Sequence, residues 1–116
     1  MKKKFLLSFM LVCISVFAVG VLNVSATSGT CGKDITWNLD DSGTLIINGS
    51  GTMTSYNIEN DNNPPWYDYR TSIKKIVIAD GITNISRDAF YGCYVDNITI
   101  PKSVTLIGRS AFESCI

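Results

Sequence analysis

Two copies of one pattern fill the last third of the chain, and the first reads Ile73-Lys74-Lys75-Ile76-Val77-Ile78-Ala79-Asp80-Gly81-Ile82-Thr83-Asn84-Ile85-Ser86-Arg87-Asp88-Ala89-Phe90-Tyr91-Gly92-Cys93. Its signature positions recur 22 residues later. The matched pairs are Ile73 and Val95, Ile76 and Ile98, Ile78 and Ile100, Ile82 and Val104, Thr83 and Thr105, Ile85 and Ile107, Arg87 and Arg109, Ala89 and Ala111, Phe90 and Phe112, and Cys93 and Cys115. Self-similarity at this period predicts a solenoid, in which each repeat forms one coil.

Each copy contains the parts of a coil. Ile76-Val77-Ile78 and Ile98-Thr99-Ile100 are short, β-branched and alternating, which indicates a strand with one buried face. Asp80-Gly81 is turn chemistry. Phe90 and Cys93, like Phe112 and Cys115, have helical i, i+3 spacing, so each pair is expected to lie on one face. One coil cannot bury these groups alone, whereas stacked coils place Phe on Phe and Ile on Ile.

The second copy resembles a known repeat family. Residues 98–115 read Ile-x-Ile-Pro-x-Ser-Val-x-x-Ile-Gly-x-x-Ala-Phe-x-x-Cys, which is similar to the BspA-type leucine-rich repeat of bacterial surface proteins. The first copy departs from it with Ala79 for Pro, Gly81 for Ser and Ser86 for Gly. The resemblance is strong from Ile73 onward and looser over residues 30–70. It implies a mainly β leucine-rich-repeat solenoid with a bacterial, secreted or cell-surface location.

The N-terminus has the composition of a secretory leader. Lys2, Lys3 and Lys4 precede an apolar run over residues 5–22, and small side chains follow up to Ala26. This pattern predicts a signal-peptide helix cleaved between Ala26 and Thr27, so the membrane is met only during export. The alternative is a transmembrane helix, because about 18 apolar residues can just span a bilayer. The basic start and the small residues before Thr27 favour the cleaved signal.

The expected organisation is a signal peptide over residues 1–26, a β-hairpin cap and loop over 27–72, and about two repeats over 73–116, the last one truncated. Removing the three leader lysines leaves 7 basic side chains against 10 acidic ones, a net charge of −3. Such a mildly acidic domain without a basic cluster argues against nucleic-acid binding. The mature length allows one domain with a modest core.

Residues 35–39 and 44–47 alternate between apolar and polar side chains around the turn Asp40-Asp41-Ser42-Gly43. This pattern predicts a β-hairpin, which we expect to cover the N-terminal end of the solenoid. Thr27 to Thr30 is small and polar, and is expected to be a mobile terminus. Asp40 and Asp41 could be calcium ligands, but an acidic turn before glycine is ordinary hairpin chemistry.

Asparagine and aspartate crowd residues 56–65, which predicts a solvated loop, because the Gly and distal Glu of an EF-hand are missing. The resembled family carries a Pro-Trp element before its first coil, so Trp66 is expected to pack onto the cap. Tyr67, Tyr69 and Arg70 follow it and are candidate surface contacts, since binding surfaces use exposed aromatics with arginine.

Three cysteines remain after the leader: Cys31, Cys93 and Cys115. Export permits disulfides, and stacking brings Cys93 and Cys115 about 5 Å apart, so a bridge between coils stays open. Their apolar repeat position favours buried free thiols, the usual role of this position in the resembled family. We expect no metal site and no cofactor, because the chain has no histidine and few clustered ligands.

Catalytic motifs are missing from the sequence, which has no histidine base, no nucleophile elbow and no Gly-rich phosphate loop before a helix. Arg87 and Arg109 recur at one coil position. They are expected to form a solvated edge near Asp80 and Asp88; a short basic ladder for an acidic ligand is the alternative.

Ile116 follows the second Cys directly, whereas a stable solenoid needs about three repeats and a polar cap. We therefore expect a piece of a longer protein, a truncated product, or a chain that associates with itself through its open C-terminal coil. The expected function is a non-catalytic interaction or adhesion module that binds a protein or glycan. The alternative is an accessory repeat domain of a larger secreted enzyme.

Overall fold

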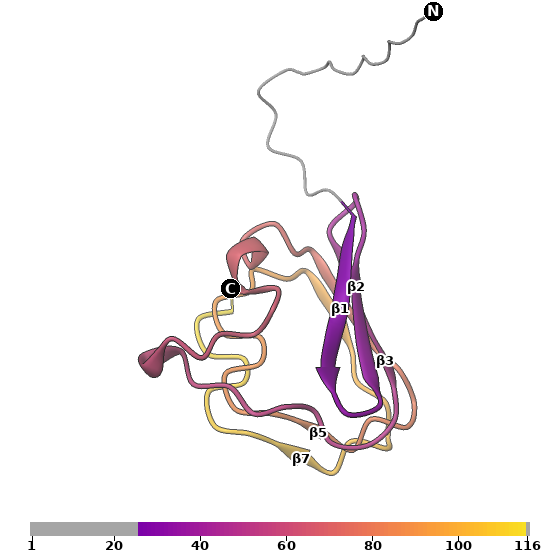
Figure 1. Ribbon diagram of the computed structural model, residues 1–116. Coiled ribbons are helices and arrows are strands. Elements are labelled where there is room, and N and C mark those ends of the chain that lie inside the picture. Colours follow the sequence, from indigo (N-terminus) through magenta and orange to yellow (C-terminus); the bar gives the residue numbers. More distant parts are fainter. Residues whose placement is uncertain (1–25, 116) are drawn as a thin grey trace, which may run out of the picture.

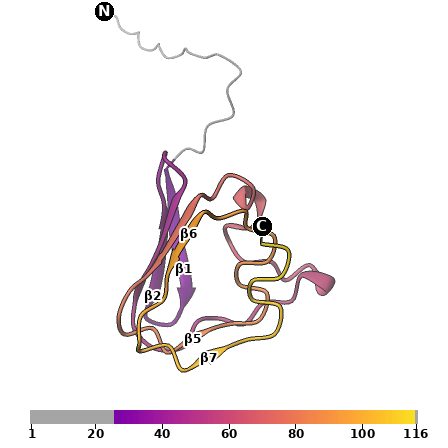
Figure 2. The same ribbon diagram turned by 180° about the vertical axis from the view of Figure 1, so that it is seen from behind.

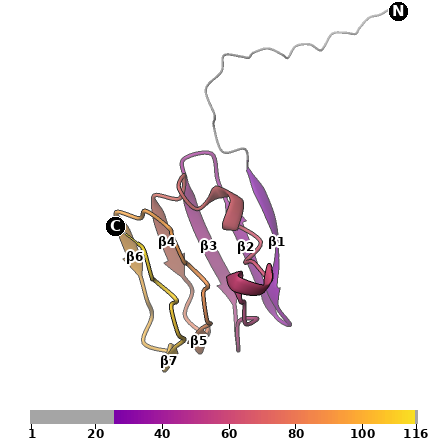
Figure 3. The same ribbon diagram turned by 90° about the vertical axis from the view of Figure 1, so that its left-hand side faces the viewer.

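The computed structural model describes residues 26–115, and the fold within them is mainly β with no α-helix. Five strands form one sheet in the order β1-β2-β3-β4-β6, seen side by side in Figure 3. Their bounds are β1 Thr27–Gly32, β2 Ile35–Leu39, β3 Thr44–Gly49, β4 Lys75–Ile78 and β6 Asn97–Thr99. Two short strands, β5 Asn84–Ile85 and β7 Leu106–Ile107, pair on another side of the molecule (Figures 1 and 2). The predicted leader lies outside the described residues.

The predicted repeats pair in register. β4 and β6 are parallel with Ile76 opposite Ile98, and β5 and β7 are parallel with Ile85 opposite Ile107. Both pairs are separated by the 22-residue period read from the sequence. We call residues 73–94 the first repeat and residues 95–116 the second repeat.

Backbone hydrogen bonds continue between the repeats outside the strands. The N–H groups of Asp88, Phe90 and Gly92 donate to carbonyls of the second repeat, at 3.1, 2.8 and 2.9 Å. In the other direction, the N–H groups of Thr105 and Gly108 donate to carbonyls of the first repeat. Each repeat therefore satisfies the polar backbone of its neighbour around most of its path.

A column of aromatic rings runs through the core. Phe90 stacks on Phe112 with ring centroids 5.5 Å apart, as the sequence predicted. Trp66 stacks on the other side of Phe90 at 5.6 Å, and Trp37 of the hairpin meets Trp66 edge-on at 5.8 Å. Trp66 is fully buried and its indole N–H donates to the Ala89 carbonyl at 2.8 Å. The expectation that Trp66 packs rather than binds is therefore confirmed.

The predicted hairpin is present. β2 and β3 pair antiparallel, with Trp37 opposite Ile47. At their turn Asp40 Oδ1 accepts hydrogen bonds from the Ser42 hydroxyl and from the backbone N–H groups of Ser42 and Thr44. These bonds, led by that of the Ser42 side chain, lower the pKa of the Asp40 carboxyl. Asp40 thus stabilises the turn.

The prediction of a mobile Thr27–Thr30 segment was wrong. These residues form most of β1, which pairs antiparallel with β2 and carries an irregularity between Thr30 and Gly32. Gly29 lies opposite Trp37. The side chains of β1 contribute little apolar surface, and Cys31 is the one buried residue of this strand. Backbone pairing along the whole of β2 therefore orders it.

Phe90 and Cys93 are both buried, as their i, i+3 spacing predicted, but the segment that carries them is not a continuous helix. In both repeats this segment forms successive turns, with i→i+3 bonds from the Cys93 N–H to the Phe90 carbonyl at 3.1 Å and from the Cys115 N–H to the Phe112 carbonyl at 3.2 Å. Asp88 and Gly92 both have positive φ, at 56° and 72°, and their counterparts Ser110 and Ser114 repeat this at 57° and 62°. A left-handed residue on each side of Phe90 prevents the helix from continuing, since right-handed helices need negative φ throughout.

At two of the positions where the first repeat departs from the family pattern, the second repeat has a residue that fits against the first. A Cβ on Gly108 would lie 2.5 Å from the Arg87 backbone nitrogen, so the second repeat needs glycine where it meets the first. The first repeat has buried Ser86 at this position. Ser103 Oγ accepts from the Gly81 N–H at 3.0 Å and donates to the Ile82 carbonyl at 2.8 Å, which joins the two repeats.

The segment before the first repeat already follows the path of a repeat. β3 pairs in parallel with β4, Leu45 opposite Ile76, and Gly51 bridges Ile82. Trp66 takes the stacking position that Phe90 and Phe112 hold in the repeats. Leu45 and its counterpart Ile76 are 31 residues apart, whereas Trp66 and its counterpart Phe90 are 24 apart. The extra residues of this segment therefore lie between Leu45 and Trp66.

Candidate functional site

Tyr67, Tyr69 and Arg70 lie on one short element, η2 (Tyr67–Tyr69), and on the residue that follows it. The Arg70 guanidinium lies over the Tyr67 ring, 3.9 Å from its centroid. Its Nη1 donates to the Tyr67 carbonyl at 2.8 Å. Tyr69 is 37% exposed, whereas Tyr67 and Arg70 are half-buried. The structure thus brings these three predicted contact residues together on the surface.

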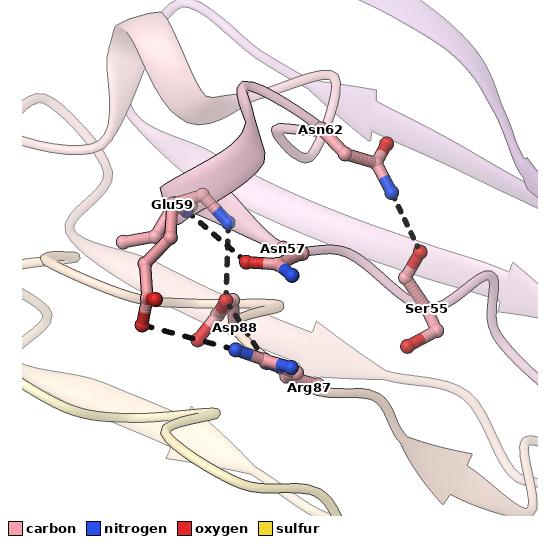
Figure 4. A network of polar contacts seen from close by, with 7 residues as sticks. Ser55, Asn57, Glu59, Asn62, Arg87 and Asp88 are labelled. Carbon is pink, nitrogen blue, oxygen red and sulfur yellow. Dashed lines mark hydrogen bonds and ion pairs between the residues drawn. The ribbon is translucent and has the colours of Figure 1, made fainter.

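Arg87 belongs to a different group. Its Nη2 lies 3.8 Å from Glu59 Oε2 and its Nε lies 3.5 Å from Asp88 Oδ2 (Figure 4). The contact with Asp88 is an ion pair without hydrogen-bond geometry, because Arg87 Nε is buried and has no hydrogen-bond acceptor. The charge of Arg87 is therefore already compensated within the chain.

Arg109 is the second-repeat counterpart of Arg87, one period later in the sequence, and it is exposed. Its carbonyl accepts the Asp88 N–H, which places the backbones of residues 87–88 and 109 side by side. In the described part of the chain only Arg87 forms ion pairs, one with Glu59 of the preceding segment and one with the expected neighbour Asp88, but none with Asp80.

The Asn-rich loop is held by the network that Figure 4 shows. Buried Asp88 accepts a hydrogen bond from the Ile58 N–H at 3.1 Å, and Asn57 caps the short helix η1 (Ile58–Asn60) by accepting from the Glu59 N–H. Asn57 and Asn62 also exchange backbone hydrogen bonds of 2.8 and 3.0 Å. Sequence reasoning did not select Asp88 as an anchor, because nothing in its own copy of the repeat distinguishes it from a turn residue.

The three cysteines outside the leader are free thiols, as the apolar repeat position of Cys93 and Cys115 predicted for those two. Cys31 and Cys93 are buried, and Cys115 is half-buried with its thiol donating to the Phe90 carbonyl at 3.0 Å. Burial raises the pKa of Cys31 to about 12. Burial, and next the nearby Cys115, raise that of Cys93 to about 12, with Arg70 opposing. High thiol pKa values mean few thiolates at neutral pH, so these groups are poor nucleophiles.

The second repeat ends in an apolar surface. Leu106 is 62% exposed and Ile107 51%, and Ile100 is 41% exposed. The first-repeat counterparts of Ile100 and Ile107 are Ile78 and Ile85, which are buried. The same pattern is thus covered in one repeat and open in the next.

No group of three or more acidic or cysteine side chains in residues 26–115 is arranged to hold a metal ion. Within the same residues, no helix has the length and apolarity to cross a membrane. Ala26 is exposed, and Thr27, the predicted first mature residue, begins β1.

Comparison with known proteins agrees with this geometry. Residues 64–116 match the family described as "BspA type Leucine rich repeat region (6 copies)". This chain contains a BspA-type leucine-rich repeat region. The match begins at Pro64, so it includes Trp66 and η2 as well as the two repeats.

One solved structure is similar over most of the chain. It is a leucine-rich repeat protein from Eubacterium ventriosum ATCC 27560, with 33% sequence identity and a TM-score of 0.70. The alignment covers 79% of this chain and 24% of that protein, so the chain spans about a quarter of its length. No curated protein matches the sequence.

Proposed function

We propose that this chain is an exported, non-catalytic protein-interaction module at the surface of a bacterium, with adhesion to other macromolecules as its role. The observation that carries the proposal is the BspA-type repeat region, whose repeats stack in register through Ile76–Ile98 and Phe90–Phe112. Stacked repeats form broad, rigid side faces, and leucine-rich repeat proteins generally use such faces to bind proteins.

The proposed architecture is a short solenoid with the β1–β3 strands as its N-terminal cap. Support comes from the single sheet, in which β3 lies next to β4, and β4 lies next to β6. The proposed surface contacts are Tyr67, Tyr69 and Arg70, with Arg109 as a further exposed cation. Arg87 contributes less, since Glu59 and Asp88 already compensate its charge.

Export is tested by expressing residues 1–116 in a bacterium and measuring the N-terminus and mass of the chain in each cell fraction. A secreted or surface-held chain that begins at Thr27 supports the proposal. A matched variant, Ala26→Glu, should block cleavage, because a signal peptidase needs a small residue there. An uncleaved chain in the cytoplasm would contradict export, and an uncleaved chain held in the membrane would favour the transmembrane alternative.

Adhesion is tested separately with beads coated with the purified chain. Retention on immobilised extracellular-matrix proteins, compared with beads coated with the unfolded chain, supports a folded binding surface. Equal retention of the folded and unfolded chain would contradict it.

A further inference from the structure

Arg70 is a cation that the described residues do not neutralise. The ion pairs found among residues 26–115 both belong to Arg87, which contacts Glu59 and Asp88. Arg70 instead has one hydrogen bond to the neutral Tyr67 carbonyl and a stacking contact with the Tyr67 ring. A half-buried guanidinium with only one protein acceptor retains several of its five N–H donors.

The position of this guanidinium is fixed before any ligand arrives. The Tyr67 ring stacks against the plane of the guanidinium, and the Tyr67 carbonyl accepts a hydrogen bond from Nη1. The Arg70 side chain also lies along the turn of the first repeat at Gly92. A Cβ on Gly92 would lie 3.1 Å from Arg70 Cδ and 3.3 Å from Nε, so the absent side chain makes room for the arginine. Gly92 has φ of 72°, which also favours glycine. A ligand therefore meets a preorganised group and loses less conformational freedom on binding.

The remaining donors face solvent. None of the Arg70 nitrogens is among the buried polar atoms without a partner, which in the described residues are Trp37 Nε1, Ser86 Oγ and Arg87 Nε. The neighbouring Tyr69 ring is 37% exposed. An open guanidinium beside an exposed tyrosine combines two residue types that are enriched in protein–protein hot spots.

We propose that Arg70, with Tyr67 and Tyr69, is a recognition site for an acidic side chain on a partner protein. The planar fork of Arg70 would take the Asp or Glu carboxylate through paired hydrogen bonds, the geometry that arginine matches and lysine does not. Tyr69 supplies an apolar contact beside the charge. The site rests on the proposed interaction function and specifies its chemistry.

The test is a titration of the purified chain, in its secreted form or, if export fails, at full length, followed by ¹H–¹⁵N NMR including the Arg70 Nε–H signal. The probe is N-acetyl-pentaglutamate amide, with N-acetyl-pentaglutamine amide as the uncharged peptide. We expect saturable shifts centred on Arg70 with the glutamate peptide only. Arg70→Gln should weaken binding by at least about tenfold, because a charge-assisted bidentate contact is lost.

Lys102→Gln is the matched control, since it removes the same charge from an exposed position in the second repeat, and should change the affinity by less than about twofold. Arg70→Lys keeps the charge but loses the fork, so it should fall between the two. If Arg70→Gln does not fold, Arg70→Lys and the Nε–H shifts of the unchanged chain still decide the question.

Three results would overturn the site: equal weakening by Lys102→Gln, no shift at millimolar peptide, or tighter binding of tetragalacturonate, which would indicate an acidic glycan. Because the titration uses purified chain, its failure leaves the export result untouched, and a failure of export leaves the titration interpretable.

Discussion

Ile85 and Ile107 are the same residue at the same repeat position, yet the structure predicts different effects when each is replaced by alanine. Ile85 is fully buried in β5, whereas Ile107 in β7 is 51% exposed at the end of the second repeat. Sequence pattern alone assigns both to the core. The matched pair therefore tests where the stack ends.

The expected magnitudes follow from burial. Replacing isoleucine by alanine removes three carbon groups, worth about 2.4 kcal/mol of transfer free energy when fully buried. At Ile85 the cavity left behind adds to this, so Ile85→Ala should lower the free energy of unfolding by about 3–4 kcal/mol. At Ile107 about half the transfer term applies and no closed cavity forms, so the loss should be about 1 kcal/mol.

The assay is equilibrium unfolding in urea, followed by the fluorescence of Trp37 and Trp66, which are both buried in the aromatic column. The slope of free energy against urea should stay constant, so that the midpoint shift reports stability. Losses for the two variants that agree within about 0.5 kcal/mol would refute the reasoning, since that is the scatter of ordinary surface substitutions. The end of the second repeat would then be covered in solution.

Three further predictions concern single positions. Gly108→Ala should destabilise the chain by about 1–3 kcal/mol, because the new methyl overlaps the backbone of the first repeat. Ser86→Ala, at the same repeat position, should be neutral or stabilising, because the buried Ser86 hydroxyl has no hydrogen-bond partner. Thermal unfolding of the two variants measures the difference. Asp88→Ala should speed hydrogen exchange at the Ile58 amide, whereas Asp88→Asn should not, since it keeps an acceptor and tolerates positive φ; equal exchange in both would contradict the anchor. The buried thiol of Cys93 has a pKa raised to about 12, so its contribution to stability is complete below the unfolded value near 9 and is lost between pH 9 and 12; Cys93→Ser should flatten that part of a urea-midpoint series, and an unchanged slope there would contradict the assignment.

Several features of the fold are predictable because they depend on neighbours in the sequence. The alternation of residues 35–39 and 44–47 around an Asp-Ser-Gly turn indicates the hairpin, and the structure confirms its pairing. The 22-residue period predicts the register between Phe90 and Phe112, which stack as expected. The assignment of free thiols at the apolar Cys positions was also correct.

Other features depend on partners far away in the chain. β1 has little apolar surface of its own, and it is ordered by pairing with β2. The loop at residues 57–62 is tied to Asp88, some 30 residues later. The path of a repeat before Ile73 is hidden in the sequence because extra residues separate β3 from Trp66.

The candidate site shows the same division. Composition alone selects Tyr67, Tyr69 and Arg70 as surface contacts, because aromatic residues with arginine are typical of binding surfaces. It cannot distinguish Arg70 from Arg87, since both are arginines beside acidic residues. The difference appears only when Glu59 and Asp88 are brought to Arg87, while Gly92 is brought to Arg70.

The amino-acid sequence by itself determined the repeat and its period, the hairpin, and the apolar side of β2, β3 and β4. These follow from local backbone preference and from the spacing of apolar residues. The tertiary structure decided which copies of the pattern are covered, how the Ala-Phe-x-x-Cys segment turns, and which arginine has its charge compensated. Those outcomes depend on contacts between segments 20 or more residues apart, whose packing and charge compensation no short stretch of the sequence contains.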